Sequence, residues 1–88
     1  MLKKEFTVTT DTGIHARPAT LLVQEASKYS AEVQLDFDGK QVNAKSIMGV
    51  MSLGIAQNAT FTIITDGNDE EDAMKGMEDL FAREGIAD

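Results

Sequence analysis

Hydrophobic and polar residues alternate along four short stretches of the chain, and each stretch predicts a β-strand. The first, "EFTVTT", covers residues 5–10 and would bury its phenylalanine and its single valine on one face. The last, "ATFTIITDG", covers residues 59–67. Two isoleucines are adjacent in it, Ile63 and Ile64, so the pattern alone leaves open which of them faces the core.

The two middle stretches belong to one segment, "AEVQLDFDGKQVN" (residues 31–43), which is interrupted by Asp38-Gly39. Apolar residues occur at alternate positions before this pair, and a valine follows it. Because glycine tolerates positive φ, Asp-Gly between two such runs is a strong signal for a tight β-hairpin turn. We therefore expect the second and third strands to pair as a hairpin.

Three other segments have the period of an α-helix. Apolar residues recur every three or four positions from residue 16 to about residue 29, and again over residues 70–84. Asp69 is the expected N-cap of the second of these helices, and Gly85 is expected to end it. A shorter helix is expected over residues 46 to about 53.

The expected order of elements is β-α-β-β-α-β-α. A hairpin within such a mixed order favours the α+β class, with an antiparallel sheet and helices on one face. The chain has 88 residues, which fits a single domain covering residues 1–88. We find no linker and no internal repeat that would argue for a second unit.

The formal net charge is −7 at pH 7, from 15 acidic and 8 basic residues. Residues 1–65 contain six of each sign, whereas residues 66–88 contain nine acidic and two basic residues and so carry the whole excess. This balance argues against nucleic acid as a partner, because phosphate backbones are bound by clustered Lys and Arg. We expect the acidic segment to be a solvated helix face.

The composition also limits the chemistry. There is no cysteine, which excludes disulfides, thiolate chemistry and cysteine-bound metals. One histidine cannot build a transition-metal site on its own. The N-terminal residues lack the apolar centre of a signal peptide, and no apolar run approaches the length of a membrane span. We therefore expect a cytoplasmic monomer without a metal, a cofactor or a membrane partner.

The only histidine, His15, lies in the stretch "TGIHARPAT" (residues 12–20). It is the expected N-cap of the first helix, and Pro18 falls in the first turn, where its missing N–H is no loss. The backbone of Ala16, Arg17 and Pro18 is expected to form an anion site beside the imidazole. Arg17 would add a planar, permanently charged donor group.

These features fit a histidine that receives a phosphoryl group. The partial positive charge at a helix N-terminus favours a neutral, nucleophilic ring and attracts a phosphate. A histidine near a helix start is, however, often an ordinary surface residue. Two alternatives therefore stay open: a regulatory binding module that does not use His15, and a domain that binds an anionic metabolite without covalent modification.

The motif "GIHARPA" (residues 13–19) resembles the active-site signature of the HPr family. HPr proteins are the histidine-containing phosphocarriers of the bacterial phosphoenolpyruvate-dependent sugar phosphotransferase system. The segment "KSIMGVMSLG" (residues 45–54) resembles the second signature of this family. The likeness extends over nearly the whole chain, and the length and the element order agree. It implies an open-faced β-sandwich, in which three helices cover a four-stranded antiparallel sheet.

By this resemblance, Enzyme I would phosphorylate His15 at Nδ1 with phosphoenolpyruvate as the donor, and sugar-specific Enzyme IIA domains would take the group. Arg17 would assist the transferring phosphoryl. The protein would then be a carrier that its partners charge and discharge, not an enzyme with its own turnover. No role is assigned to Glu84 or Asp88, because the end of the chain has no strong family signature.

Ser46 is the expected N-cap of the short helix. No Glu or Gln follows three residues later, so the cap can be purely structural. The resemblance to Gram-positive HPr proteins implies that an ATP-dependent HPr kinase/phosphorylase modifies this serine. The phosphoserine form would be a corepressor of a catabolite control transcription factor and a poor substrate of Enzyme I. A regulatory relative keeps this serine but lacks the histidine, whereas this chain has both.

The short helix also has more apolar residues than one buried face requires. Three of them share an arc beside the face that would enter the core, and a Met-containing surface suits docking to several partners. The alternative is that all three are core residues of a small domain. Two residues of the first helix would extend this surface toward the histidine. The expected docking residues are Ile47, Met48, Met51, Thr20 and Leu21.

Overall fold

The structure is a computed structural model and describes residues 1–88. It contains four strands and three helices in the expected order, so the α+β class is confirmed. The elements are β1 Leu2–Thr7, α1 Ala16–Ala26, β2 Glu32–Phe37, β3 Lys40–Asn43, α2 Ile47–Met51, β4 Thr60–Asp66 and α3 Glu70–Glu84.

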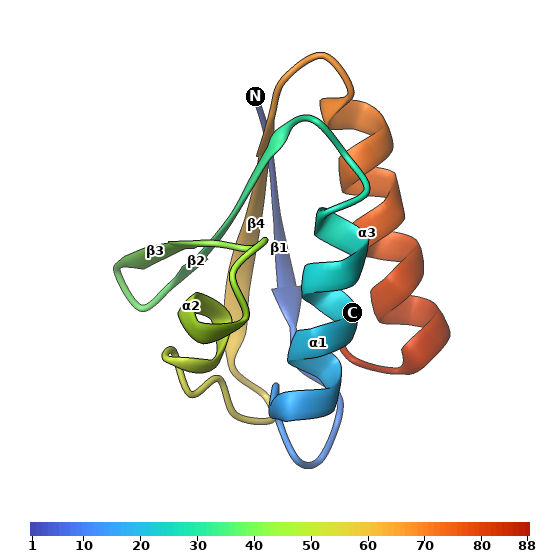
Figure 1. The fold of residues 1–88 in the computed structure, drawn as a ribbon. Coiled ribbons are helices and arrows are strands. Elements are labelled where there is room, and N and C mark those ends of the chain that lie inside the picture. The colour runs from blue at the N-terminus through green and yellow to red at the C-terminus, as the bar shows by residue number, and fades with distance from the viewer.

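The strands form one antiparallel sheet in the order β1-β4-β2-β3. The last strand in the chain, β4, therefore lies between β1 and β2, and it joins the beginning of the chain to its middle (Figure 1). Asp38 and Gly39 close the β2–β3 hairpin with φ angles of 52° and 80°. Two positive φ angles are typical of the type I′ turn that Asp-Gly favours, so the predicted hairpin is confirmed.

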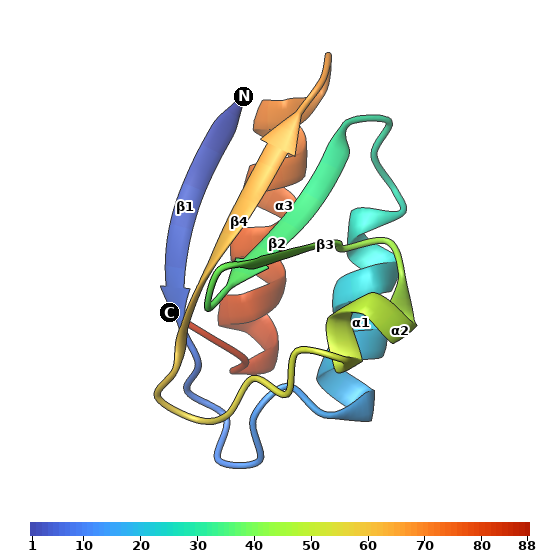
Figure 2. The same cartoon turned by 90° about the vertical axis from the view of Figure 1, so that its left-hand side faces the viewer.

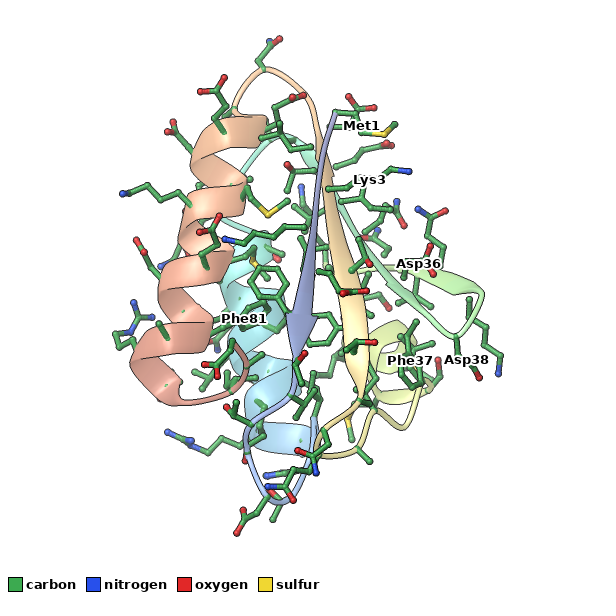
Figure 3. The ribbon with its side chains drawn as sticks, turned by 180° about the vertical axis from the view of Figure 1, so that it is seen from behind. Met1, Lys3, Asp36, Phe37, Asp38 and Phe81 are labelled. Atoms are coloured by element: carbon green, nitrogen blue, oxygen red, sulfur yellow. The ribbon has the colours of Figure 1, made fainter.

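The helices lie on one face of the sheet, and the other face is open (Figure 2). Phe6 on β1, Phe61 on β4 and Phe81 on α3 form the aromatic part of the core between these layers. The Phe6 and Phe81 rings meet edge to face, with centroids 4.8 Å apart. Figure 3 shows Phe81 pointing toward the sheet, whereas Lys3 and Asp36 lie on the opposite side. The open-faced β-sandwich is therefore confirmed.

The structure also resolves the ambiguity in the fourth strand. Ile63 belongs to the core, together with the other alternate residues of β4. Ile64 lies on the open face between Lys3 of β1 and Gln34 of β2, yet it is only 6% exposed. Long polar neighbours on adjacent strands can cover an isoleucine in this way. Both residues are therefore buried, but on different faces.

The first strand begins and ends earlier than predicted, at residues 2–7 instead of 5–10. Its register with β4 ends where Thr7 faces Thr60, the first residue of β4. Beyond this point the backbone of Val8 turns to Ala59 and Ala87 instead of continuing the pairing with β4. The alternation pattern cannot reveal this shift, because the residues before Phe6 are mostly polar and lie on an exposed edge strand.

Two of the helices are shorter than predicted. The first α-helix ends at Ala26, and the next residues continue in a tighter turn in which Tyr29 N–H bonds to Ala26. That turn preserves the apolar spacing beyond the helix itself. The short helix covers residues 47–51, and residues 52–54 likewise continue it only as a turn. The third helix has the predicted bounds, and Gly85 ends it in the left-handed conformation with φ 64°.

Asp69 is the N-cap residue of α3, as predicted, but its side chain makes no capping hydrogen bond to the helix. Its carboxylate accepts hydrogen bonds from the N–H groups of Ser30 and Ala31, at 2.9 and 2.7 Å. These bonds, led by that from Ser30, lower the pKa of the Asp69 carboxyl. Asp69 therefore fastens the loop between α1 and β2 to the start of α3.

The loop that precedes α1 crosses the segment that follows α2 at Gly13. Gly13 has a φ of +71°, and a Cβ at this position would lie 2.6 Å from the Ile55 carbonyl oxygen. That same oxygen accepts a hydrogen bond of 2.9 Å from Ile14 N–H. Only glycine combines this backbone conformation with such a close approach. The crossing therefore fixes the residues immediately before the predicted site.

Replacing Gly13 with alanine tests this crossing. We expect Gly13→Ala to lower the free energy of unfolding by about 3 kcal/mol or more, because positive φ and overlap with backbone both oppose the new Cβ. Gly54→Ala is the matched control, since Gly54 has a φ of +61° and no atom within 4 Å of an added Cβ. It should cost about 1–2 kcal/mol. If urea unfolding shows that Gly13→Ala and Gly54→Ala lose the same free energy of unfolding, the close approach at Gly13 does not contribute to stability.

Candidate functional site

His15 is the N-cap residue of α1, as predicted. Its backbone is extended, with φ −92° and ψ −162°, and its carbonyl oxygen accepts the N–H of Ala19 at 3.0 Å. The imidazole makes no capping hydrogen bond, and the residue is exposed. Its chain neighbour Ile14 is 6% exposed, and Pro18 in the first turn is also buried. Buried residues on both sides therefore hold an exposed ring at the end of the helix.

Two backbone donors are available beside this ring. The first hydrogen bond of the helix comes from Ala19, so the N–H groups of Ala16 and Arg17 have no backbone acceptor. Pro18 has no N–H, so of the three residues expected to form the anion site it contributes only the fixed φ of the first turn. The helix has no acidic residue in its first turn. The donors and the positive end of the helix dipole therefore favour an anion.

A second segment supports the loop that carries His15. The residues after α3 run antiparallel to the end of β1, and Thr7 exchanges two backbone hydrogen bonds of 2.9 Å with Asp88. The Ile86 carbonyl accepts the N–H of Thr9 at 2.9 Å. Ile86 itself is buried in the core. Figure 1 shows the start of α1 and the end of α3 at the same end of the molecule.

Arg17 is bound by a residue that the sequence analysis left without a role. Its guanidinium donates to the Glu84 carboxylate at 3.3 Å, and Arg83 also contacts this carboxylate, at 3.6 Å. Glu84 is the last residue of α3. A negative charge at a helix C-terminus opposes the helix dipole. This unfavourable position was the one signal in the sequence that Glu84 has a positively charged partner elsewhere in the chain. Asp88, also left unassigned, pairs with Thr7 through its backbone.

Ser46 is the N-cap of α2, and its Oγ accepts a hydrogen bond from Gly49 N–H at 3.2 Å. The predicted cap is confirmed, and the residue is exposed. Val50, on the inner side of this short helix, is 1% exposed and anchors it to the core. The Ser46 hydroxyl therefore lies at the surface, at the start of a helix that Val50 anchors to the core.

Three apolar side chains of α2 lie at the surface beside Ser46, and we call them the α2 patch: Ile47, Met48 and Met51. Their exposed fractions are 37%, 81% and 44%. The hypothesis that all three are core residues is therefore wrong. Leu21 of α1 is half-buried and packs against the core, while Thr20 is exposed and its hydroxyl bonds to the Ala16 carbonyl at 2.8 Å. Figure 2 shows α2 beside α1.

The site is a surface and not a cavity, since the molecule has no pocket. No three His, Cys, Asp or Glu side chains are grouped so that they would hold a metal ion. No helix is both long enough and apolar enough to cross a membrane. What the site offers is an exposed imidazole, two backbone donors and an arginine, with an apolar patch on the neighbouring helix.

A family model described as the PTS HPr component phosphorylation site matches residues 2–83. The chain belongs to the HPr family. Its members are phosphocarriers of the phosphotransferase system, so the family assigned from the two sequence motifs is confirmed.

Solved structures of HPr proteins agree with this family. HPr-C-His from Thermoanaerobacter tengcongensis is 46% identical, with 93% of this chain and 92% of that chain covered and a TM-score of 0.89. The histidine-containing phosphocarrier of a Mycoplasma is 36% identical, with 97% of both chains covered and a TM-score of 0.93.

The catabolite repression protein Crh of Bacillus subtilis is 43% identical to this HPr chain, with 96% of this chain and 97% of that chain covered and a TM-score of 0.74. That structure is described as a dimer with a swapped domain. Because a relative of this similarity forms a dimer, the expected monomer stays a prediction for this chain.

The end of this HPr chain provides a test of what holds the His15 loop. We expect Ile86→Ala to lower the free energy of unfolding by about 2–4 kcal/mol, because it leaves a cavity under the paired segments. Glu84→Gln should cost less than about 1 kcal/mol, because the Arg17 side chain is 72% exposed and an exposed ion pair contributes little. Chemical unfolding of both variants measures the two losses of unfolding free energy. A larger loss in Glu84→Gln than in Ile86→Ala would show that the ion pair, and not the buried Ile86, stabilises this part of the fold.

Proposed function

We propose that this HPr protein carries a phosphoryl group on His15. The observation that carries the proposal is the exposed imidazole at the start of an eleven-residue helix, beside the unpaired N–H groups of Ala16 and Arg17. A phosphoryl group on the ring would meet these donors and the positive end of the helix. The first motif points to the same histidine.

In the proposed reaction, Enzyme I supplies a phosphoryl group that comes from phosphoenolpyruvate. The lone pair of His15 Nδ1 attacks phosphorus, the N–P bond forms, and the bond between phosphorus and the donor atom breaks. The reverse steps pass the group to an Enzyme IIA domain. The ring must be neutral to attack, and its second nitrogen then holds the proton. The transition state is loose, so the protein needs mainly to position charge around the phosphoryl group.

Arg17 is proposed to stabilise the phosphoryl group during transfer. Its guanidinium supplies several fixed donors that match phosphate oxygens, and its charge does not depend on pH. The side chain is largely exposed, so its contact with Glu84 is an exchangeable one. We propose that Arg17 leaves Glu84 for the phosphoryl group when His15 is charged.

The protein is proposed to act as a carrier that its partners charge and discharge. The donor and the acceptor of the phosphoryl group both come from partners, and the surface site is open enough for either to reach His15. The α2 patch next to α1 is a suitable place for them to dock, because exposed Met side chains adapt to different partners. Since phosphoenolpyruvate is the proposed donor, we place the protein in the cytoplasm.

Ser46 is proposed as the regulatory site, with HPr kinase/phosphorylase as the enzyme that modifies it. A phosphate on Ser46 would add a charge of about −2 at the edge of the α2 patch. The N-cap position tolerates this charge, so the fold would persist. Docking of Enzyme I would become weaker, because the dianion would lose water at an apolar contact. A catabolite control transcription factor is the proposed reader of the phosphoserine form.

Intact mass spectrometry after incubation with Enzyme I and phosphoenolpyruvate tests the carrier function. We expect one added phosphoryl group that mild acid removes, and none in His15→Ala. If the wild-type chain gains no mass while a control HPr does, the carrier function is excluded. A charge that persists in His15→Ala would place the acceptor elsewhere.

The same measurement with HPr kinase and ATP tests the regulatory site. One acid-stable phosphoryl group is expected, absent from Ser46→Ala. If the protein is a regulatory module that does not use His15, it should accept the phosphoryl group on Ser46 but none on His15. If the protein is a domain that only binds an anionic metabolite, it should accept neither phosphoryl group.

A charged side chain in the α2 patch tests its role in docking. We expect Met48→Asp to lower kcat/KM for charging by Enzyme I about tenfold or more, because a carboxylate would be buried against an apolar partner surface. Gln41→Asp is the control, because it adds the same charge at an exposed position of β3. Unchanged kinetics in folded Met48→Asp would exclude the patch as a docking surface.

A further inference from the structure

The five methionines of this chain fall into two environments. Met74 and Met77 lie in the core, with exposed fractions of 6% and 0%. Met48 and Met51 lie one turn apart on α2, with exposed fractions of 81% and 44%, and Met1 is also exposed. Because the chain has no cysteine, these thioethers are its most readily oxidised side chains. The difference in exposure predicts that peroxide reaches the α2 methionines well before the core methionines.

We propose that Met48 and Met51 are an oxidation site through which peroxides switch off docking at the α2 patch. This proposal rests on the proposed function of the patch. In the reaction, a sulfur lone pair attacks the terminal oxygen of a peroxide, the O–O bond breaks, and the proton on the attacked oxygen passes to the leaving oxygen. The thioether becomes a sulfoxide by a two-electron oxidation, and the peroxide is reduced to an alcohol or to water. No metal or cofactor is required.

The physical effect of this change is confined to the surface. A sulfoxide is a strong hydrogen-bond acceptor, so burying it against an apolar partner leaves it unpaired and weakens association. Val50 is the residue of α2 that is buried in the core, so we expect the helix to keep its fold when either sulfur is oxidised. Oxidation of Met48 and Met51 would therefore weaken docking without destabilising the fold. Oxidation of the buried Met77 would destabilise the fold as well.

The location also makes the modification accessible to repair. Methionine sulfoxide reductases act on accessible sulfoxides, with one enzyme for each of the two epimers. Met48 is four-fifths exposed, on a helix of only five residues. The oxidised side chain would therefore be open to repair without unfolding. Ser46 immediately precedes the patch, so we expect a kinase that docks here to be affected in the same way.

The experiment compares wild-type protein with the double variant Met48→Leu/Met51→Leu. Leucine keeps the apolar volume but has no sulfur to oxidise. Each protein is treated with hydrogen peroxide, and peptide mass mapping follows oxidation at each methionine. The initial rate of charging by Enzyme I at low carrier concentration is then compared with the untreated rate of the same protein. Met1, Met74 and Met77 are present in both proteins and serve as internal controls.

For the wild type, we expect oxidation at Met48 and Met51 before Met74 and Met77, and a fall in the charging rate of about tenfold. The double variant should keep its own untreated rate at the same peroxide dose. A mixture of the two sulfoxide reductases should restore charging to the oxidised wild type. Near-ultraviolet circular dichroism should be unchanged throughout.

Three results would overturn the proposal. One is oxidation of the core methionines at the same rate as Met48 and Met51. Another is complete oxidation of both α2 methionines without loss of charging. The third is an equal loss in the double variant, which would assign the effect to another residue. If the untreated wild type is not charged at all, the proposed function itself fails, and that result is distinct from any effect of peroxide.

Discussion

The hydrogen bond from Ile14 N–H to the Ile55 carbonyl is the contact on which the arrangement of the site depends. It joins the loop before α1 to the segment after α2, so the two helices that carry His15 and Ser46 share one fixed point. Gly13 allows the approach, because any other residue would place a Cβ against the same oxygen. This backbone contact therefore links the loop that carries His15 to the segment that follows the α2 patch.

The distribution of charge complements this support. The excess negative charge of the chain lies in residues 66–88, largely along α3, whereas the segment around His15 is balanced. The α2 helix likewise contains no acidic residue. Glu84 is the point where the acidic helix reaches the site, and it contacts Arg17 there. The phosphoryl group proposed at His15 would thus face backbone donors and an arginine, and the rest of the acidic helix extends away from His15.

Local patterns were sufficient for much of the fold and for the centre of the site. Asp38-Gly39, the apolar stripe of α3 and the N-cap positions of His15 and Ser46 depend on neighbouring residues, and the structure has each of them as expected. The contact of Arg17 with Glu84 spans 67 positions, and no local rule connects two such residues. Asp69 shows the same limit, because its carboxylate bonds to backbone groups 38 and 39 positions away.

The pairing of Thr7 with Asp88 has a consequence for how the protein is made. The loop that carries His15 receives part of its support from residues 86–88, which leave the ribosome after everything else described here. The same holds for β1, whose partner β4 is synthesised more than fifty residues later. The emerging chain can form the hairpin and α1 early, but it cannot complete the site. A chain that stops before residue 86 therefore lacks this support for the loop that carries His15.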